Sequence, residues 1–151
     1  MDYLLGRGIS PEDWILVHDS NRPLLALSDV DALIGAVERT RDGGILCQPI
    51  YDTVKYSETD RISKTLSRSH LYRAQTPQTF TIGSLSEALR EALRTGVEIT
   101  DESQAIEKFA GLFPLLIPGQ ASNIKITKPE DLEIAKLFIK LAMQTAPERE
   151  L

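Results

Sequence analysis

Residues 15–23 read Ile15-Leu16-Val17-His18-Asp19-Ser20-Asn21-Arg22-Pro23. The run opens with aliphatic residues and is too short for a helix, which predicts a buried strand. It then breaks into small polar residues, a guanidinium and a proline. A buried strand that delivers Asp19 and Arg22 into a loop is typical of an open α/β sheet, in which ligands bind beyond the carboxyl ends of the strands.

The two charged residues of this loop have two interpretations. The Asp19 carboxylate can hold a divalent cation or a sugar hydroxyl, and Arg22 can bind a phosphate through two parallel N–H bonds. Alternatively, the loop is a plain strand-end turn, in which Asp19 accepts backbone N–H bonds and Arg22 is solvated. The chemistry of the residues leaves both interpretations open.

Composition sets limits on the class of protein. The 151 residues fit a single domain, residues 1–151, and the 42% hydrophobic and 26% charged fractions are those of a globular chain. The net charge of −5 argues against a general nucleic-acid binder. The single cysteine, Cys47, follows apolar residues and predicts a buried thiol in a reducing compartment. No apolar run has the length of a bilayer span and no basic leader is seen, so we expect a cytoplasmic protein with no membrane partner.

The spacing of hydrophobic residues, together with helix-capping and helix-ending residues, predicts the order of the secondary-structure elements. Ser28 is expected to cap a helix that Gly43-Gly44 stops, and Thr81 to cap a helix over residues 82–95 whose buried side includes Leu93. A capping box at Thr127-Lys128-Pro129-Glu130 is expected to open the last helix. The remaining expected elements are strands over residues 14–17, 45–50, 115–117 and 124–126 and a helix over residues 100–111. This order predicts an α/β fold, with parallel strands inferred from the order alone.

Residues 51–73 differ in character from the rest. Two alternating segments, residues 52–56 and 61–66, flank a polar turn, which predicts a β-hairpin. Its apolar residues are too few to form a core, so it needs another surface to cover it. Either it is an arm that packs on a second subunit, or it lies over its own subunit.

Most familiar catalytic signatures are absent. The two histidines, His18 and His70, and Cys47 show no metal-ligand spacing. His18 follows a strand, which raises hydrolase chemistry, but no Gly-x-Ser-x-Gly motif accompanies it, so a structural histidine is the preferred interpretation. A P-loop and a Gly-x-Gly-x-x-Gly fingerprint are also missing.

Cations and small hydroxyls do gather at the ends of the expected elements. They are Arg22, Thr53, Lys55, Arg68 and Lys125. Nucleotidyl transfer needs a clamp of positive charge and hydrogen-bond donors, usually with Mg²⁺, and this set suits such a clamp. Taken singly, each Lys or Arg is more often a solvated surface charge. Lys125 is the exception, because its isoleucine neighbours favour a covered stem and an amine directed into a site.

Five ordered motifs resemble a known family. They are residues 17–23, Asp52-Thr53-x-Lys55, Gln75-Thr76-Pro77-Gln78-x-Phe80, Thr100-Asp101-Glu102, and residues 123–132 with Asn123-Ile124-Lys125. The chain is similar to the 2-C-methyl-D-erythritol 4-phosphate cytidylyltransferases of non-mevalonate isoprenoid biosynthesis, from Trp14 to about Leu141. The resemblance implies the C-terminal portion of a Rossmann-like nucleotidyltransferase sheet with a protruding β-hairpin arm, at about residues 51–73.

The resemblance also implies roles for single residues. CTP and a sugar-alcohol phosphate would react with Mg²⁺ present. Asp19 and Arg22 would hold the polyol part of the substrate, and Asp19 would help to place the metal. Thr53 would bind the substrate phosphate, and Arg68 would reach that phosphate from the second subunit of a homodimer. Lys125 would neutralise charge at the reacting phosphates.

The sequence departs from the family pattern at three places. It has no glycine-rich nucleotide loop with basic residues, Ser122 stands where many members carry an aspartate, and Asn21 replaces a small apolar residue, a change expected to alter local packing. We therefore expect the substrate-binding and dimerising portion of a longer protein, which is marginally stable and inactive when alone. The alternatives are a ribitol-5-phosphate cytidylyltransferase and a non-catalytic dimerising module that binds a sugar phosphate.

Overall fold

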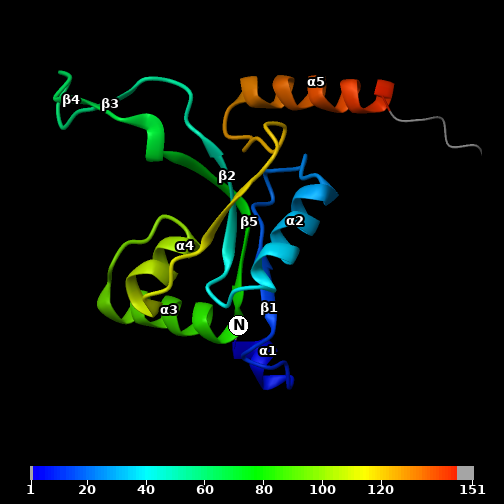
Figure 1. Ribbon diagram of the computed structural model, residues 1–151, viewed down its shortest axis with the longest axis vertical. Coiled ribbons are helices and arrows are strands. Elements are labelled where there is room, and N and C mark those ends of the chain that lie inside the picture. The colour runs from blue at the N-terminus through cyan, green and yellow to red at the C-terminus, as the bar shows by residue number, and fades with distance from the viewer. Residues whose placement is uncertain (1, 146–151) are drawn as a thin grey trace, which may run out of the picture.

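The computed structural model describes residues 2–145 and centres on a four-stranded sheet of order β1-β5-β2-β6 (Figure 1). Its strands are β1 (Trp14–Val17), β2 (Gly44–Pro49), β5 (Tyr72–Thr81) and β6 (Leu115–Pro118). Strand β5 runs antiparallel to both β1 and β2, whereas β2 and β6 run parallel. The α/β class is confirmed, but the sheet is mixed, so the inferred parallel pairing holds only for β2 and β6.

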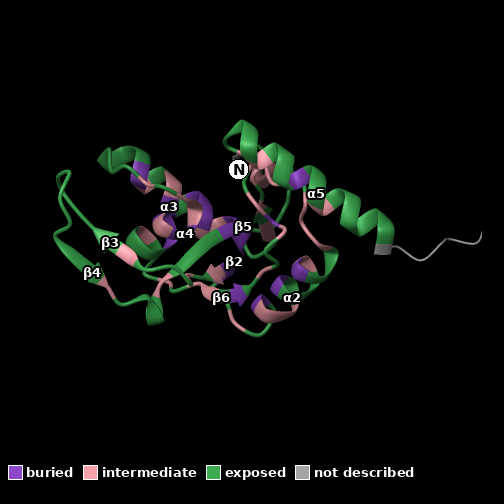
Figure 2. Cartoon of the chain, turned by 90° about the horizontal axis from the view of Figure 1, so that it is seen from above, coloured by how far each residue is buried: buried purple, intermediate pink, exposed green. Residues whose placement is uncertain are grey.

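Helices cover both faces of this sheet, as Figure 2 shows. Helix α2 (Leu27–Val37) lies on one face, and α3 (Ile82–Thr95), α4 (Glu102–Ala105) and η2 (Ile106–Ala110) lie on the other. Neighbouring residues of β2 point to opposite faces: Ile45 packs in a cluster with Phe80 on the α3 side, and Leu46 packs with Leu33 on the α2 side. The chain therefore forms three layers with a core on each side of β2.

Helix α3 begins and ends as the sequence predicts. The hydroxyl of Thr81 accepts a bond from the backbone N–H of Ser84 at 3.3 Å, and Gly96 closes the helix with φ of 67°. The prediction that Leu93 is buried is wrong, since 84% of it is exposed. One residue turns a helix by about 100°, and that rotation carries Leu93 away from the covered side, which holds Ala92.

Helix α2 differs from the prediction at both ends. It begins at Leu27 after Ala26, so Ser28 lies inside the first turn and is not the cap. It ends at Val37, and the glycine pair lies at the start of β2 instead. Gly43 has φ of +82°, and a Cβ there would lie 2.5 Å from the carbonyl oxygen of Thr79, so this position needs glycine for the close approach of β5.

The predicted strand over residues 124–126 is also wrong, because this segment joins no sheet. It is tied to one residue instead: Ile126 and Asn21 exchange two hydrogen bonds, of 2.9 and 3.0 Å. Helix α5 (Pro129–Thr145) follows it, and Asp131 rather than Glu130 accepts the N–H groups of Thr127 and Lys128.

The hairpin is confirmed as β3 (Val54–Tyr56) paired with β4 (Lys64–Leu66), a two-stranded sheet that projects from the body (Figure 1). Its base is held at two points. The guanidinium of Arg68, in η1 (Arg68–His70), donates to the carbonyl of Tyr51, and the N–H of Ile50 donates to Leu71 at 3.1 Å. We call residues 51–70 the arm.

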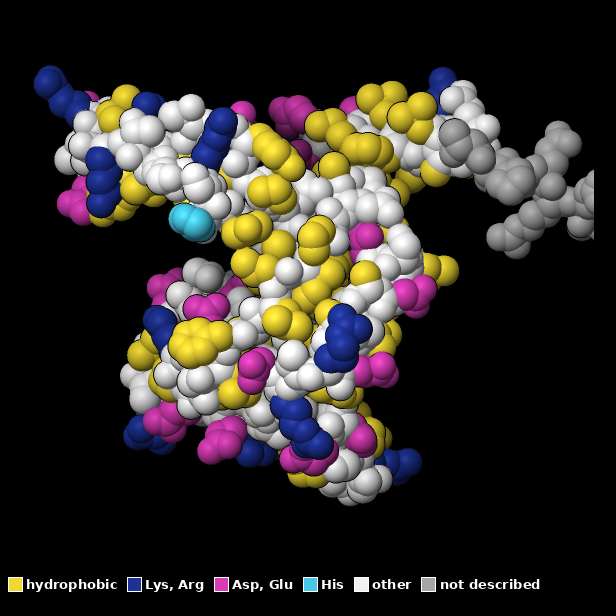
Figure 3. All heavy atoms as spheres, in the orientation of Figure 1, with side chains coloured by type: hydrophobic (Ala, Val, Ile, Leu, Met, Phe, Trp, Pro, Cys, Tyr) yellow, Lys and Arg dark blue, Asp and Glu magenta, His cyan; other side chains and the backbone are white. Residues whose placement is uncertain are grey.

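The two remaining helices of the described chain, α1 (Asp2–Gly6) and α5, cover little of the sheet. Helix α1 is short. Helix α5 carries hydrophobic side chains along its length in Figure 3, and Ala135 is its one buried hydrophobic residue among those described. No helix within residues 2–145 combines the length and apolar character that a bilayer crossing requires.

Candidate functional site

The predicted loop after β1 is a tight turn. The N–H of Arg22 donates to the carbonyl of Asp19 at 3.1 Å. The N–H of Asp19 donates in turn to the hydroxyl of Thr76, on β5, at 2.9 Å. The central strand therefore fixes the place of the turn, and the turn directs the Asp19 and Arg22 side chains to the same side.

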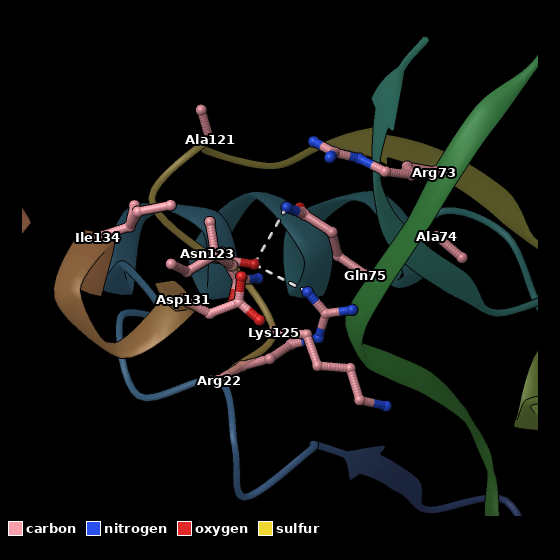
Figure 4. A pocket seen from close by; sticks show the side chains of 10 residues that line it. Arg22, Arg73, Ala74, Gln75, Ala121, Asn123, Lys125, Asp131 and Ile134 are labelled. Atoms are coloured by element: carbon pink, nitrogen blue, oxygen red, sulfur yellow. Dashed lines mark hydrogen bonds between the residues drawn. The ribbon is translucent and has the colours of Figure 1, made fainter. Parts of the chain in front are cut away.

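Three of the predicted site residues meet there. One oxygen of Asp19, Oδ2, lies 3.1 Å from Arg22 Nε and 3.1 Å from Lys125 Nζ. Arg22 also donates from Nη1 to the carbonyl of Asn123 at 2.8 Å, as Figure 4 shows. Only 11% of the Arg22 side chain is exposed, so the alternative of a solvated Arg22 is wrong. Lys125 directs its amine to Asp19 but stays 46% exposed, so its stem is less covered than expected.

The segment that carries Lys125 is positioned from β5. The side-chain amide of Gln75 donates to the carbonyl of Asn123 at 3.2 Å, and Asn123 donates from Nδ2 to the carbonyl of Thr76 at 2.8 Å. Both side chains are buried. Sequence reasoning assigned no role to Gln75 and Asn123, although both belong to motifs that it quoted. Asn21, expected to alter local packing more than charge, donates from its side chain to the carbonyl of Ile126.

The cluster places two positive charges around one carboxylate. Partial burial pushes the pKa of Asp19 upward, but hydrogen bonds and positive charge from Lys125 and Arg22 outweigh that effect and hold the pKa below its usual value. Asp19 is therefore ionised at neutral pH and neutralises part of the charge of the two cations.

Two hollows of about 330 and 300 Å³ adjoin this cluster and share Arg22, Ala74, Gln75 and Lys125. The first hollow extends toward Arg73 and Asp131 (Figure 4). The second reaches Asp19 and the start of α4 at Asp101 and Glu102. Because Arg22 and Lys125 line both hollows, a ligand bound in either one would contact both cations.

Within the described residues, no group of three or more histidine, cysteine, aspartate or glutamate side chains is placed to hold a metal ion. Asp101 is occupied as a helix cap: it accepts bonds from Gln78, Ser103 and Gln104. Asp19 lines the second hollow too, and it is the carboxylate in contact with both Arg22 and Lys125.

Thr53 and Arg68 lie apart from this cluster. Both are exposed on the arm, and neither lines the two hollows. Lys55 is engaged within the arm, where its amine donates to Thr65 across the hairpin at 2.7 Å. Within one chain, then, the structure brings together Asp19, Arg22 and Lys125 but not the predicted residues of the arm.

Comparison with known proteins identifies the family. The family model described as IspD, 2-C-methyl-D-erythritol 4-phosphate cytidylyltransferase, matches residues 7–141. The protein of that name from Hahella chejuensis is 46% identical over 134 residues, which are 88% of this chain and 55% of that protein. The one from Pseudomonas syringae pv. tomato is 48% identical over 87% of this chain and 56% of its own length.

Solved structures give the same result. A crystal structure of a 4-diphosphocytidyl-2C-methyl-D-erythritol synthase superposes with a TM-score of 0.80 at 43% identity, covering 91% of this chain and 62% of that one. The cytidylyltransferase from Thermus thermophilus superposes with a TM-score of 0.78 at 30% identity, over 92% and 66% of the two chains.

This chain spans about 55% of the length of the curated relatives that it matches. The matched region contains β1, the turn with Asp19 and Arg22, the arm, and the segment with Lys125. The chain belongs to the 2-C-methyl-D-erythritol 4-phosphate cytidylyltransferase family.

Proposed function

We propose that this chain provides the sugar-phosphate side of a cytidylyltransferase site, at which CTP and 2-C-methyl-D-erythritol 4-phosphate form 4-diphosphocytidyl-2-C-methyl-D-erythritol and diphosphate. The observation that carries the proposal is the grouping of Asp19, Arg22 and Lys125 beside the two hollows. The relatives bear the name of this activity.

The reaction asks for charge stabilisation more than covalent help from the protein. A phosphate oxygen of the substrate attacks the α-phosphorus of CTP, the bond from that phosphorus to the bridging oxygen breaks, and diphosphate leaves. Fixed cations lower the energy of the charge that develops on the oxygens. Arg22 is held at two points and suits orientation of a phosphate, whereas the half-exposed Lys125 is free to exchange Asp19 for a phosphate oxygen.

A divalent cation fits this arrangement through Asp19. Mg²⁺ keeps several waters and is bound by one or two carboxylates together with substrate phosphates. Both cations contact Oδ2 of Asp19, which leaves Oδ1 as the oxygen for a metal. When bound, the ion would offset negative charge on the phosphates, while Asp19 would keep its contact with Arg22 and release Lys125 to them.

The arm is the proposed dimer contact. It projects from the body and exposes apolar side chains, with Tyr51 76% and Ile62 67% exposed. In a homodimer joined through this arm, Thr53 and Arg68 of one subunit would contact the substrate phosphate held by the other. Sedimentation equilibrium would test this: we expect a dimer that Ile62→Asp converts to a monomer, and a monomeric wild type would contradict it.

Calorimetric titration with 2-C-methyl-D-erythritol 4-phosphate tests the site itself. We expect wild type to bind it and Lys125→Met to weaken binding about tenfold, since a hydrogen bond to a charged group is worth about 1.5–3 kcal/mol. Lys136→Met is the matched control, because Lys136 pairs with Glu133 on exposed α5. Ribitol 5-phosphate in a parallel titration distinguishes the alternative substrate, and equal affinity of Lys125→Met and wild type would reject the site.

Turnover is a separate question. The sequence contains no glycine-rich stretch followed by arginine and lysine to hold the CTP triphosphate. We expect the purified 151-residue chain to form no product from CTP and substrate. Turnover that Arg22→Ala or Lys125→Ala abolishes would contradict this expectation.

A further inference from the structure

His18 lies between the central strand and the turn of the site. Its Nδ1 is 3.0 Å from the hydroxyl of Thr76, and its Nε2 is 3.0 Å from the carbonyl oxygen of Arg22. His18 does not line either hollow at the cluster. Any effect of this ring on a ligand therefore acts through the residues that it holds.

The partners of the ring determine where its proton lies. The carbonyl oxygen of Arg22 can only accept, so Nε2 must carry the hydrogen. The hydroxyl of Thr76 already accepts the N–H of Asp19, and its own hydrogen is available to Nδ1 of a neutral ring. The result is a continuous chain of donors: Asp19 N–H to Thr76, Thr76 O–H to His18, and His18 Nε2–H to the carbonyl of Arg22.

This series of hydrogen bonds connects both ends of the turn to β5. Asp19 is held at its backbone N–H by Thr76, and Arg22 is held at its backbone carbonyl by His18, which rests on the same threonine. The Asp19 and Arg22 side chains that face the hollows extend from these two fixed points. Without the ring, the carbonyl of Arg22 would lose its link to β5.

We propose that His18 is a positioning residue: as the Nε2–H tautomer it fixes the backbone of Arg22, and thereby aims the guanidinium at the phosphate of a bound sugar phosphate. This role rests on the function proposed above. It assigns no proton transfer to His18.

The tautomer is tested without any ligand. Long-range ¹H–¹⁵N correlation spectra of ¹⁵N-histidine protein, at mildly alkaline pH, should show His18 with a protonated Nε2 and a bare Nδ1. Both histidines are exposed, but only His18 has ring hydrogen bonds among the described residues. His70 in η1 should therefore show the tautomer mixture of a solvated ring and gives the internal reference. An Nδ1–H ring at His18 would overturn the proposal.

Two substitutions separate positioning from general stability. The terminal amide of His18→Gln can replace the Nε2–H donor to Arg22, whereas His18→Asn can replace only the contact with Thr76 at Nδ1. Calorimetry with 2-C-methyl-D-erythritol 4-phosphate should show near-wild-type affinity for His18→Gln and about fivefold weaker binding for His18→Asn. Lys136→Met, on exposed α5, is the control and should bind as wild type.

The outcomes are distinct. Equal affinity of the Gln and Asn variants, whether both are weakened or both unchanged, would overturn the proposal, because a merely structural ring would not depend on which nitrogen is replaced. Matching thermal midpoints of the two variants exclude a difference in folding. If wild type binds no sugar phosphate while His18 is the Nε2–H tautomer, the proposed function fails and the hydrogen-bonded chain stands.

Discussion

Arg22 and Lys125 carry the same charge but are held in different ways. Arg22 is mostly buried and bonds to both Asp19 and the carbonyl of Asn123, whereas Lys125 is half exposed and, among the described residues, pairs with Asp19 alone. A lysine could not reproduce the two divergent N–H bonds of Arg22. The two cations therefore suit different tasks, fixed orientation and movable charge.

The first prediction concerns Asp19. Because the pKa of Asp19 is held below its usual value, its pairing stabilises the fold above the unfolded-state pKa of about 3.9 and is lost as pH falls through the folded-state value. Lys125→Met should raise the pKa of Asp19, and NMR titration of the carboxyl carbon measures it. Lys136→Met should leave it unchanged, and an unshifted pKa in Lys125→Met would contradict the pairing.

The second prediction concerns Cys47. Burial raises the pKa of this thiol, and only 2% of the residue is exposed. We expect iodoacetamide to leave the folded chain unmodified and to alkylate Cys47 once urea unfolds it. Mass spectrometry reads both states, and rapid alkylation without urea would show that the β2 core opens readily.

At this scale the sequence predicted part of the charged cluster and none of its supports. Two further cations that it singled out, Lys55 and Arg68, lie on the arm instead. Asp19, Arg22 and Lys125 could be predicted because charge at an element end is visible in the sequence. Gln75, Asn123 and Asn21 could not, since their hydrogen bonds join segments that lie far apart along the chain. The sequence shows where a charged residue lies along the chain, but its hydrogen-bond partners depend on how β5 packs against residues 120–126.

Among the elements, β5 organises the site. It pairs with both β1 and β2. Three of its side chains hydrogen-bond to other parts of the site: Thr76 to the turn, Gln75 to residues 120–126, and Gln78 to the N-cap of α4. The cap of α4 is the most connected of these links, because Asp101 accepts bonds from three residues.

The third prediction follows from that cap. Asp101→Ala should reduce the free energy of unfolding by about 2 kcal/mol, since it removes a helix cap and leaves the buried amide of Gln78 without its acceptor. Urea denaturation measures the loss. Glu102→Ala, which removes the next carboxylate and leaves the bonds of this cap intact, should change stability little, and equal losses in both variants would reject the explanation.

Local signals predicted the bounds of α3 correctly but failed at both ends of α2. The N-cap Thr81 and the terminal Gly96 bound α3 within its own sequence. Residues 124–126 look like a strand, but strand formation needs a neighbour, and the neighbour here is the single residue Asn21. The start of α2 was missed for a related reason, because the hydroxyl of Ser28 accepts a bond from the side chain of distant Gln120 and does not cap its own helix.

The molecule as a whole leaves much apolar surface uncovered. Leu27 is 81% exposed, Phe113 77% and Met143 75%, and β1 pairs on one side only among the described strands. Exposed apolar surface and an open strand edge favour association and weaken the fold. The expectation of marginal stability stays a prediction on these grounds.

The fourth prediction tests that expectation. Thermal unfolding followed by circular dichroism should be broad, and the native chain should bind the dye ANS. Addition of 2-C-methyl-D-erythritol 4-phosphate should sharpen and raise the transition by mass action. A compact monomer with a sharp transition and no dye binding would contradict the prediction.

The closed base of the arm makes it separable from the body. Because Arg68 bonds to the carbonyl of Tyr51 and Ile50 bonds to Leu71, the chain leaves and re-enters the sheet at one point. The loop between those points can vary in length at small entropic cost, about 0.6 kcal/mol for each doubling. Replacing residues 52–67 by a short glycine linker should therefore preserve the sheet while removing self-association. Such an excision would turn the arm into a detachable part, so that partner choice could evolve, or be redesigned, without altering the turn that holds Arg22.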